Sequence, residues 1–588
     1  MSLANISTTV QFNYRPSNDL FLRKLPASRS FDFGPQAPLV VVAVFIALFV
    51  LGEVGQFLLA HRQLSTGQKG NYVILPWLWY LGTPQFFTKE CRYLAKALQR
   101  FPGSWFRFRV RENDVVIVSG SEARHVFFNC QSLTFLEGYF LLHPNMRYLL
   151  PEAYTDGKDG FGWLLKQFAR IDVLQRFLAP TVADAQGLLT ELGKEGIMDP
   201  FTEVDRAVFS VSTRIAAGNE IADEPEKLSA MHRALSWLQK SSTPQAHILP
   251  WIPTPARFRG VIGALKLHRM LSEVFSKRKR HSASNNDVLQ SLVDEDVSAT
   301  QASVLTIMTI LAAHTNTSAI LSWLIITLVQ HPTWLAAVRA EVDAFLSTHH
   351  VSTPSHSPSP IGTPCPTDSP SDIPFVAWER ALPTLDLCLQ ECLRLYMNVP
   401  LIRRNTGEDI EVAGRTIASG DYVMYMMEDA HLDAAAYPEP MRFDPLRDRS
   451  RAGKSGFVAW GAGTHPCTGQ RLAKLIIKVF VSLLLWNYDL ELVDARGELL
   501  KKAPQPVMGL FSVPRPDADV RWCYPFARNR SKSVFAVGKK GASSRMRRMI
   551  LSRLQGIRKT EAEADPYIDI ANCTVYTLAH SLDDGAHT

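Results

Sequence analysis

One cysteine in a glycine-rich turn constrains this chain more than any other feature. Residues 460–469 read Trp-Gly-Ala-Gly-Thr-His-Pro-Cys-Thr-Gly, and an apolar run with helical spacing, 470–486, follows directly. Cys467 therefore precedes the N-terminus of a helix, whose positive end and free N–H groups would stabilise a thiolate. Glycines without a Cβ let the backbone turn tightly and approach a flat ligand; they stand at Gly461, Gly463 and Gly469.

A thiolate in such a position is a good axial ligand for haem iron. The string resembles the haem-binding loop of the cytochrome P450 family, Phe-Gly-x-Gly-x-Arg/His-x-Cys-x-Gly, with Trp460 in place of the usual Phe. The resemblance implies that Cys467 ligates the iron of haem b and that His465 contacts a haem propionate. Trp460 keeps an aromatic wall beside the sulfur, adds an N–H donor, and with Gly461 belongs to the cofactor-binding loop.

A second signature precedes the cysteine by about seventy-five residues. Glu391 and Arg394 lie three residues apart, so on a helix they share a face and can pair. The Phe-Asp-Pro-Leu-Arg segment ending at Arg447 resembles the family segment whose arginine completes a buried Glu-Arg-Arg network. The resemblance gives Glu391, Arg394 and Arg447 that structural role, with Arg442 as the alternative partner. It also places Arg403 on a haem propionate, since a guanidinium grips a carboxylate with two hydrogen bonds.

The third signature is an uncharged run, Gln301–Ala337, which is long enough to span a membrane. The polar block 313–318, Ala-His-Thr-Asn-Thr-Ser, would be costly at the centre of a bilayer. In a member of this family the run is instead the buried helix that crosses the distal face of the haem. Thr317 would then donate a hydrogen bond to the bound oxygen molecule, whereas Asn316 replaces the usual acid and cannot supply a proton.

The distal block leaves alternatives open. Its Ala-x-x-x-Asn-Thr form resembles the branch that holds the sterol 7α-hydroxylases and prostacyclin synthase. A peroxide isomerase or dehydratase that needs no reductase is therefore the first alternative to a monooxygenase. A non-enzymatic haem sensor is the third. His314 could be a distal iron ligand, but a residue three positions before Thr317 need not point at the iron. The usual Trp-x-x-x-Arg haem contact is missing, and Lys166 or Arg170 is its candidate replacement.

The remaining sequence suggests one large domain with additions. The 588 residues are 46% hydrophobic, enough for a sizeable core, and the eight scattered cysteines suit a reducing compartment. We expect an N-terminal lumenal segment at 1–37, a transmembrane anchor at 38–60, a catalytic domain at 61–527 and a basic tail at 528–588. Within the domain, 350–374 is rich in Ser, Pro and Thr and predicts a disordered insertion.

The basic pI comes from the tail. Residues 528–559 hold eleven Lys and Arg and no acid, whereas the whole chain carries a formal charge of +7. The rest of the chain is therefore slightly acidic, which gives no reason to expect nucleic acid binding. Residues 545–558 predict a basic amphipathic helix on an anionic membrane, or else a disordered tail.

We thus expect a mainly α fold with small β-sheets, the cytochrome P450 fold, behind an N-terminal transmembrane helix. The resemblance implies a monooxygenase on the cytosolic face of the endoplasmic reticulum membrane that receives NADPH-derived electrons from NADPH–cytochrome P450 reductase. Lys474 and Lys478, four residues apart on the helix after Cys467, are candidate docking charges for that partner. The substrate would be a hydrophobic small molecule of secondary metabolism, such as a terpenoid, sterol-like or polyketide intermediate.

Overall fold

The computed structural model describes most of the chain between residues 72 and 524. The described residues are 72–75, 83, 86, 94, 103–111, 113–141, 166, 170–243, 246, 254–281, 285, 287–349, 351, 369–453, 456–500, 502–507 and 513–524. The chain divides into two units, Met1–Gly55 and Gln56–Thr588, and every described residue belongs to the second. The expected lumenal segment, anchor and basic tail lie outside the described residues.

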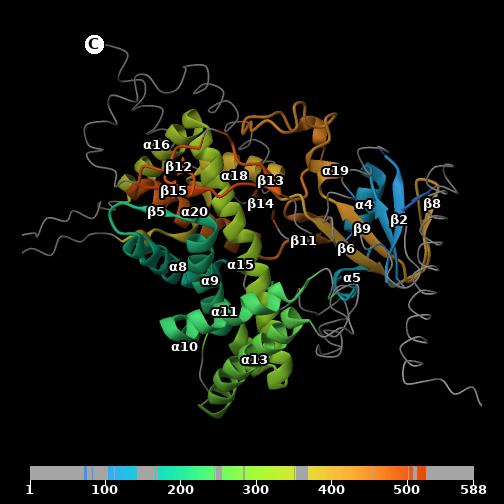
Figure 1. Cartoon of the computed structure of the whole chain (residues 1–588), viewed down its shortest axis with the longest axis horizontal. Helices are drawn as coiled ribbons and strands as arrows, with labels where there is room; N and C mark the ends of the chain where they lie inside the picture. Colours follow the sequence, from blue (N-terminus) through green and yellow to red (C-terminus); the bar gives the residue numbers. More distant parts are fainter. Residues whose placement is uncertain are drawn as a thin grey trace, which may run out of the picture. The chain divides into compact units, whose positions relative to one another are not determined.

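The described chain is mainly α-helical (Figure 1). Its helices are α4 (Ser121–Asn129), α5 (Phe135–Tyr139), α8 (Ile171–Leu192), α9 (Pro200–Ala217), α10 (Asn219–Ala222), α11 (Pro225–Lys240), α13 (Pro255–His281), α14 (Val288–Asp294), α15 (Ala299–Gln330), α16 (Pro332–Thr348), α17 (Phe375–Arg380), α18 (Pro383–Tyr396), α19 (Glu428–His431) and α20 (Gln470–Asn487). Short 3₁₀ turns lie at η2 (Pro370–Asp372) and η3 (Ser450–Ala452).

One six-stranded sheet stands beside the helices, in the order β1-β2-β3-β9-β6-β4. Its strands are β1 (Tyr72–Ile74), β2 (Trp105–Val110), β3 (Asn113–Val118), β4 (Leu133–Thr134), β6 (Pro400–Asn405) and β9 (Tyr422–Met426). β2 and β3 are paired antiparallel as a hairpin. β3 pairs parallel with β9 and β4 pairs antiparallel with β6, so the sheet joins strands that lie far apart in the sequence.

Smaller sheets complete the fold. They are β5 (Ile197–Met198) with β12 (Glu491–Val493) and β15 (Arg521–Cys523), β7 (Ile410–Val412) with β8 (Arg415–Ile417), β10 (Gly461–Ala462) with β11 (His465–Pro466), and β13 (Pro506–Val507) with β14 (Arg515–Pro516). The mainly α architecture with small sheets is as the sequence predicts.

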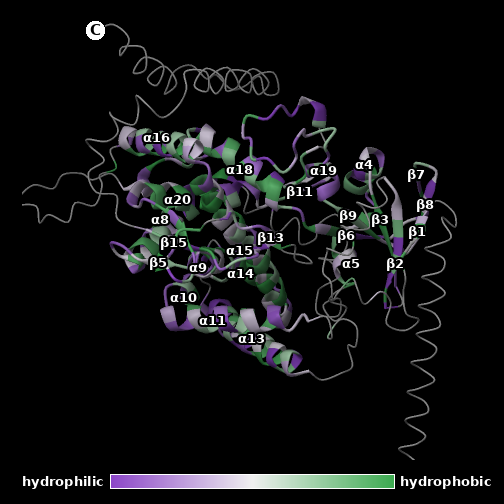
Figure 2. Cartoon of the chain, turned by 45° about the horizontal axis from the view of Figure 1, so that its top comes forward, coloured by the Kyte–Doolittle hydropathy of each residue, from purple (hydrophilic) through white to green (hydrophobic). Residues whose placement is uncertain are grey.

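Helix α15 is the centre of the helical part. A capping box at Ser298 and Gln301 begins it, and the chain turns at His331 before Pro332 starts α16. The uncharged run is therefore two helices. Among the described residues α15 alone is long and apolar enough to cross a membrane, but it packs against α9, α13, α18 and α20, and α15 and α20 are largely hydrophobic (Figure 2). That packing makes α15 a core helix, as the polar block predicts.

The end of the Ser/Pro/Thr-rich segment is ordered, whereas the sequence predicts disorder there. Residues 352–368 lie outside the described part, but Ser369 caps the turn η2 and Pro370 is buried. The backbone N–H of Phe375 donates to Gln175 on α8 at 2.8 Å. The insertion expected to be disordered through 374 is thus ordered from 369 onward, because its last residues pack on α8.

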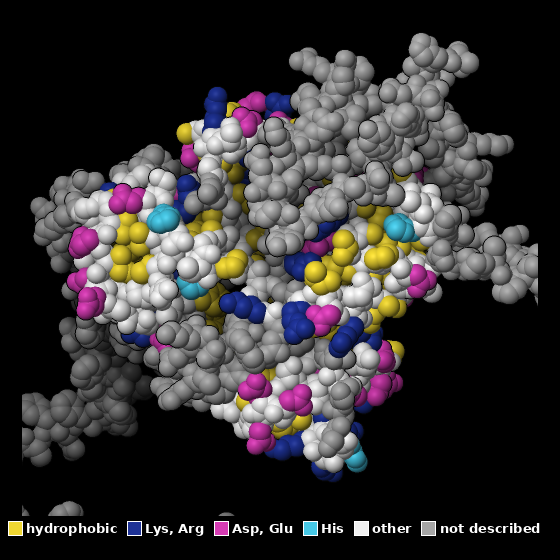
Figure 3. Space-filling view, turned by 180° about the vertical axis from the view of Figure 1, so that it is seen from behind, with side chains coloured by type: hydrophobic (Ala, Val, Ile, Leu, Met, Phe, Trp, Pro, Cys, Tyr) yellow, Lys and Arg dark blue, Asp and Glu magenta, His cyan; other side chains and the backbone are white. Residues whose placement is uncertain are grey.

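On the face seen in Figure 3, charged side chains of both signs lie between hydrophobic ones.

Candidate haem site

Cys467 follows a two-stranded hairpin. Gly461 in β10 pairs with Pro466 in β11, and the Cys467 N–H donates to the Trp460 carbonyl. Gly461 has φ 73°, and a Cβ there would lie 2.4 Å from the His465 carbonyl oxygen, so this turn requires glycine. The hairpin thus fixes the half-buried Trp460 and Cys467 at the start of α20.

The hairpin also contacts α4. Gly463 has φ 60°, and a Cβ there would lie 2.4 Å from Asn129 Oδ1. The Thr464 N–H donates to the Phe128 carbonyl at 3.2 Å. Gly469, by contrast, has φ −88° as the N-cap of α20, so its conformation does not require glycine. Two of the three glycines therefore have the conformational role that the sequence gives them.

The protein alone does not favour a thiolate on Cys467. Burial of the sulfur raises its pKa, although the residue as a whole is exposed. Hydrogen bonds from the backbone N–H groups of Gly469 and Gln470 lower the pKa but do not outweigh burial. The backbone N–H groups at the start of the helix therefore act in the expected direction. A bound metal ion deprotonates a coordinating thiol outright, so iron can supply the missing stabilisation.

Arg403 is a buried cation with no acidic partner among the described residues. It lies on β6, is 4% exposed, and donates from Nη1 to the Leu133 carbonyl at 3.2 Å, while its Nε has no partner there. Its guanidinium lies 4.8 Å from the ring centre of Phe127. Burial lowers the pKa of Arg403 to about 10, because nothing nearby compensates for the lost solvation.

His465 lies within electrostatic range of Arg403. Burial and the Arg403 charge lower the pKa of His465 to about 4, despite a hydrogen bond with the Cys130 backbone. Its Nε2 is buried and has no partner in the described part of the chain. Lys166 also lowers that pKa, so it lies nearby, whereas Arg170 pairs with Asp172 at 3.1 Å. The Arg403 guanidinium and the His465 Nε2, both buried without an acidic partner among the described residues, can donate hydrogen bonds to an anionic ligand such as a haem propionate.

Glu391 accepts hydrogen bonds from two arginines in the buried core. On α18 it accepts from Arg394 at 2.7 and 3.0 Å, and from Arg447 Nε at 3.2 Å. All three side chains are at most 5% exposed. Arg442, the alternative partner, points its side chain to solvent and Glu439, and only its carbonyl accepts from Arg447.

The polar block lies in the middle of α15. Thr317 is buried, and Asn316 is half-buried with an Oδ1 that has no partner among the described residues. His314 points toward α9, where its Nε2 lies 2.9 Å from Asp205 Oδ1. That orientation gives no support to His314 as a distal iron ligand.

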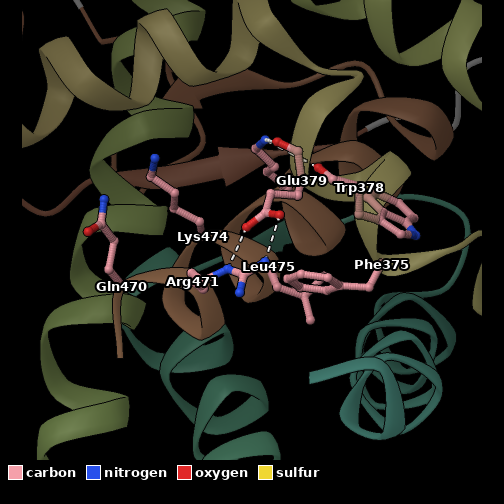
Figure 4. A pocket seen from close by; sticks show the side chains of 8 residues that line it. Phe375, Trp378, Glu379, Gln470, Arg471, Lys474 and Leu475 are labelled. Carbon is pink, nitrogen blue, oxygen red and sulfur yellow. Dashed lines mark hydrogen bonds and ion pairs between the residues drawn. The ribbon is translucent and has the colours of Figure 1, made fainter. Parts of the chain in front are cut away.

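The two lysines after Cys467 differ in exposure. Lys474 is half-buried and lines a pocket with the bidentate pair of Arg471 and Glu379 (Figure 4). Lys478 is buried, and its Nζ donates to Asp386 Oδ2 and the Glu379 carbonyl, both at 2.7 Å. Lys478 is therefore not a docking charge, because its ammonium is already satisfied inside the core.

His431 is a connecting residue that sequence reasoning missed. It is fully buried: Nε2 accepts from the Val458 N–H at 3.0 Å, and Nδ1 lies 3.1 Å from Asn398 Oδ1. Its carbonyl accepts from Arg394 at 2.8 Å. His431 thus links the Glu391 network to the segment just before Trp460. No pattern around it distinguishes it from a surface histidine.

Gly138 on α5 is a second missed residue. A Cβ there would lie 2.4 Å from the Arg403 Cα, so only glycine lets α5 pack on this part of β6.

A mainly helical fold with a cysteine hairpin ahead of the last long helix of the described chain is the arrangement that the sequence resemblance implies. The family model described as cytochrome P450 matches residues 172–520, more than half of the chain. The chain therefore belongs to the cytochrome P450 family.

Curated relatives agree with this family. A cytochrome P450 monooxygenase of Aspergillus aculeatus is 27% identical over 71% of this chain and 85% of its own length. One of Passalora fulva is 27% identical over 77% and 87%. Among solved structures, the retinoic acid-bound cyanobacterial protein CYP120A1 superposes with a TM-score of 0.61 at 22% identity, over 76% of this chain and 97% of its own. The chain is accordingly an oxygenase of a family that uses haem iron and reductase-derived electrons.

Proposed function

We propose that the chain is a membrane-anchored monooxygenase that binds haem b through Cys467. The observation that carries the proposal is the buried Arg403 guanidinium, which has no acidic partner among the described residues, together with the unbonded His465 Nε2 beside the cysteine hairpin. Arg403, His465 and Lys166 would hold the propionates, and Trp460 with Gly461 would shape the loop around the sulfur. When bound, thiolate-ligated haem supplies the activation of O₂. The Glu391, Arg394 and Arg447 network would hold this part of the core rigid.

Thr317 and Asn316 would control proton delivery on the distal side of the haem, opposite Cys467. The Thr317 hydroxyl can hold and pass a proton through Oγ1, whereas an amide cannot act as an acid at ordinary pH. The free Asn316 Oδ1 can accept a hydrogen bond from a water molecule. Proton delivery would therefore pass through ordered water and Thr317.

Electrons would come from NADPH through NADPH–cytochrome P450 reductase, with Lys474 as a docking charge. The substrate would be a terpenoid, sterol-like or polyketide intermediate of secondary metabolism, in keeping with the fungal relatives. We place the enzyme on the endoplasmic reticulum membrane, anchored by residues 38–60. An exposed apolar face on α13 supports membrane contact, because its members recur at helical spacing: Phe258, Val261 and Leu265, exposed by 70, 57 and 63%.

The experiment compares product formation with and without the reductase. Metabolites are profiled in a host that expresses the chain, and Thr317→Ala is compared with Thr315→Ala, whose hydroxyl accepts from Gln239 on α11. Thr317→Ala should lower product formation per NADPH consumed, by up to about 10²–10⁴-fold for a lost general acid and by less where water substitutes.

Asn316 supports one alternative, a peroxide isomerase or dehydratase that needs no external proton donor or electrons. Full turnover without reductase, unaffected by Thr317→Ala, would establish that alternative and exclude the monooxygenase.

A further inference from the structure

Three helices bring an aspartate and two histidines together. Asp205 comes from α9, His232 from α11 and His314 from α15. His232 Nε2 lies 3.1 Å from Asp205 Oδ2, and His314 Nε2 lies 2.9 Å from Asp205 Oδ1. One potential ligand atom from each side chain lies within 4.8 Å of the other two. The three side chains thus share one small volume between helices.

The surroundings hold these side chains in place. The Phe209 ring contacts both imidazoles, with centroids 4.6 Å from His232 and 5.4 Å from His314. Ser318 Oγ donates to Asp205 Oδ1 at 3.0 Å. Such a hydrogen bond behind a carboxylate is what orients ligands at metal sites.

His314 is poorly satisfied by the protein alone. Its side chain is 4% exposed, and neither ring nitrogen makes an aligned hydrogen bond within the described residues. Nε2 is close enough to Asp205 for an ion pair, but its direction is out of line for a hydrogen bond. A buried polar atom that makes no hydrogen bond destabilises the fold. A positive ion between Nε2 and the carboxylate would remove that cost.

We propose that Asp205, His232 and His314 form a binding site for Zn²⁺. Two imidazoles and one carboxylate suit zinc and neighbouring transition metals, whereas Mg²⁺ and Ca²⁺ prefer oxygen ligands. Tetrahedral ligands at zinc bond lengths lie about 3.3 Å apart. The two nitrogen–oxygen distances of 2.9 and 3.1 Å are close to that spacing. Three protein ligands leave a fourth position for water.

The site would link three helices next to the polar block of α15. His314 lies three residues before Thr317 on that helix, and Ser318 orients Asp205. Bound zinc would therefore fix the turn of α15 that holds Thr317 relative to α9 and α11. The zinc proposal does not rest on the identity of the reaction that the enzyme catalyses.

The experiment measures zinc binding to the haem-loaded protein. After dialysis against a chelator, Zn²⁺ is titrated by equilibrium dialysis with elemental analysis, with Mg²⁺ as the comparison ion. One equivalent of Zn²⁺ should bind and raise the unfolding temperature, and excess Mg²⁺ should not displace it. His314→Gln and Asp205→Asn should each weaken zinc binding at least about tenfold, the loss that even a partner outside the coordination sphere can cause.

His268→Gln on α13 is the matched control, because His268 hydrogen bonds to Ser303 and lies outside the cluster. It should bind zinc like the wild type. Haem content reports folding, and if His314→Gln fails to fold, His232→Gln replaces it, since His232 is 29% exposed at the rim. Zinc affinity that is unchanged in folded Asp205→Asn and His232→Gln proteins, or no stoichiometric binding to the wild type, would overturn the proposal.

Discussion

Glu391 accepts a hydrogen bond from Arg447 at 3.2 Å although 56 residues separate them in the chain. Both side chains are almost completely buried, and Arg447 also donates to the carbonyls of Pro438, Glu439 and Arg442. The arginine therefore ties the loop before the cysteine hairpin to α18. Removing one member leaves a buried charge without its full set of partners, which is more damaging than losing the pair.

Arg447→Ala should lower the free energy of unfolding by about 3–5 kcal/mol, the cost of breaking a buried ion pair on one side. Haem content should fall with it, because the loop contacted by Arg447 leads to the cysteine hairpin. Chemical unfolding and the haem-to-protein ratio measure the two effects. Arg442→Ala, which removes an exposed side chain, should change stability by no more than about 0.5 kcal/mol. Equal stability of the two variants would contradict a structural role for Arg447.

Arg403→Gln should affect the haem-free and haem-loaded proteins in opposite directions. In the haem-free protein the buried guanidinium has no acidic partner within the described residues, so its neutralisation should stabilise the fold. In the loaded protein the same change removes a propionate partner, so haem should dissociate faster. Thermal unfolding of both forms and haem transfer to an acceptor protein test this.

The adjacent Arg404→Gln is the control for Arg403. Its side chain forms an ion pair with Glu137 on α5, at 3.2 Å. It should leave the rate of haem loss unchanged. A loss of haem that is equally fast in both variants would exclude Arg403 as a specific contact.

His431 should make the protein sensitive to acid. Burial lowers its pKa to about 3 from 6.5, helped by the nearby Arg394 charge. The folded protein then binds fewer protons than the unfolded chain between these values, so stability is full above pH 6.5 and falls as the pH drops toward 3. His431→Gln should flatten this slope, although its lost hydrogen bonds lower stability at every pH. Unfolding between pH 4 and 7.5 measures it, and an equally steep slope in the variant would refute the assignment.

Local patterns predicted the parts of the molecule in which neighbouring residues determine the structure. The tight turns at Gly461 and Gly463 and the pairing of Glu391 with Arg394 follow from residue type and spacing along the chain. The burial of Lys478 does not, because its acceptors come from α17 and α18 about a hundred residues earlier. The same holds for the Asp205 cluster, whose members belong to three helices. Tertiary packing determines these contacts, and the spacing of residues along the sequence does not predict them.

Membrane contact through α13 predicts residual binding without the N-terminal segment. A protein lacking residues 1–61 should still associate with phospholipid vesicles, because Phe258, Val261 and Leu265 share one exposed face. Replacing each with Ser should weaken vesicle binding by about tenfold per residue, since burying such a side chain contributes about 1.5–3 kcal/mol at most. Leu499→Ser, at a 65% exposed position in another region, is the control. Undiminished vesicle binding by the triple variant would contradict the role of α13.

Cys467→Ala should abolish the spectral signature of a thiolate ligand. The reduced, CO-bound wild type should show the long-wavelength Soret band that thiolate donation produces, and the variant should lack it even where some haem remains bound. Cys523→Ala, a half-buried cysteine on β15, should keep the band, which excludes a general effect of losing a thiol. Trp460→Phe should also keep it, because either aromatic side chain can stand beside the sulfur. A thiolate band that persists in Cys467→Ala would transfer the ligand to another cysteine and remove the basis of the proposed haem site.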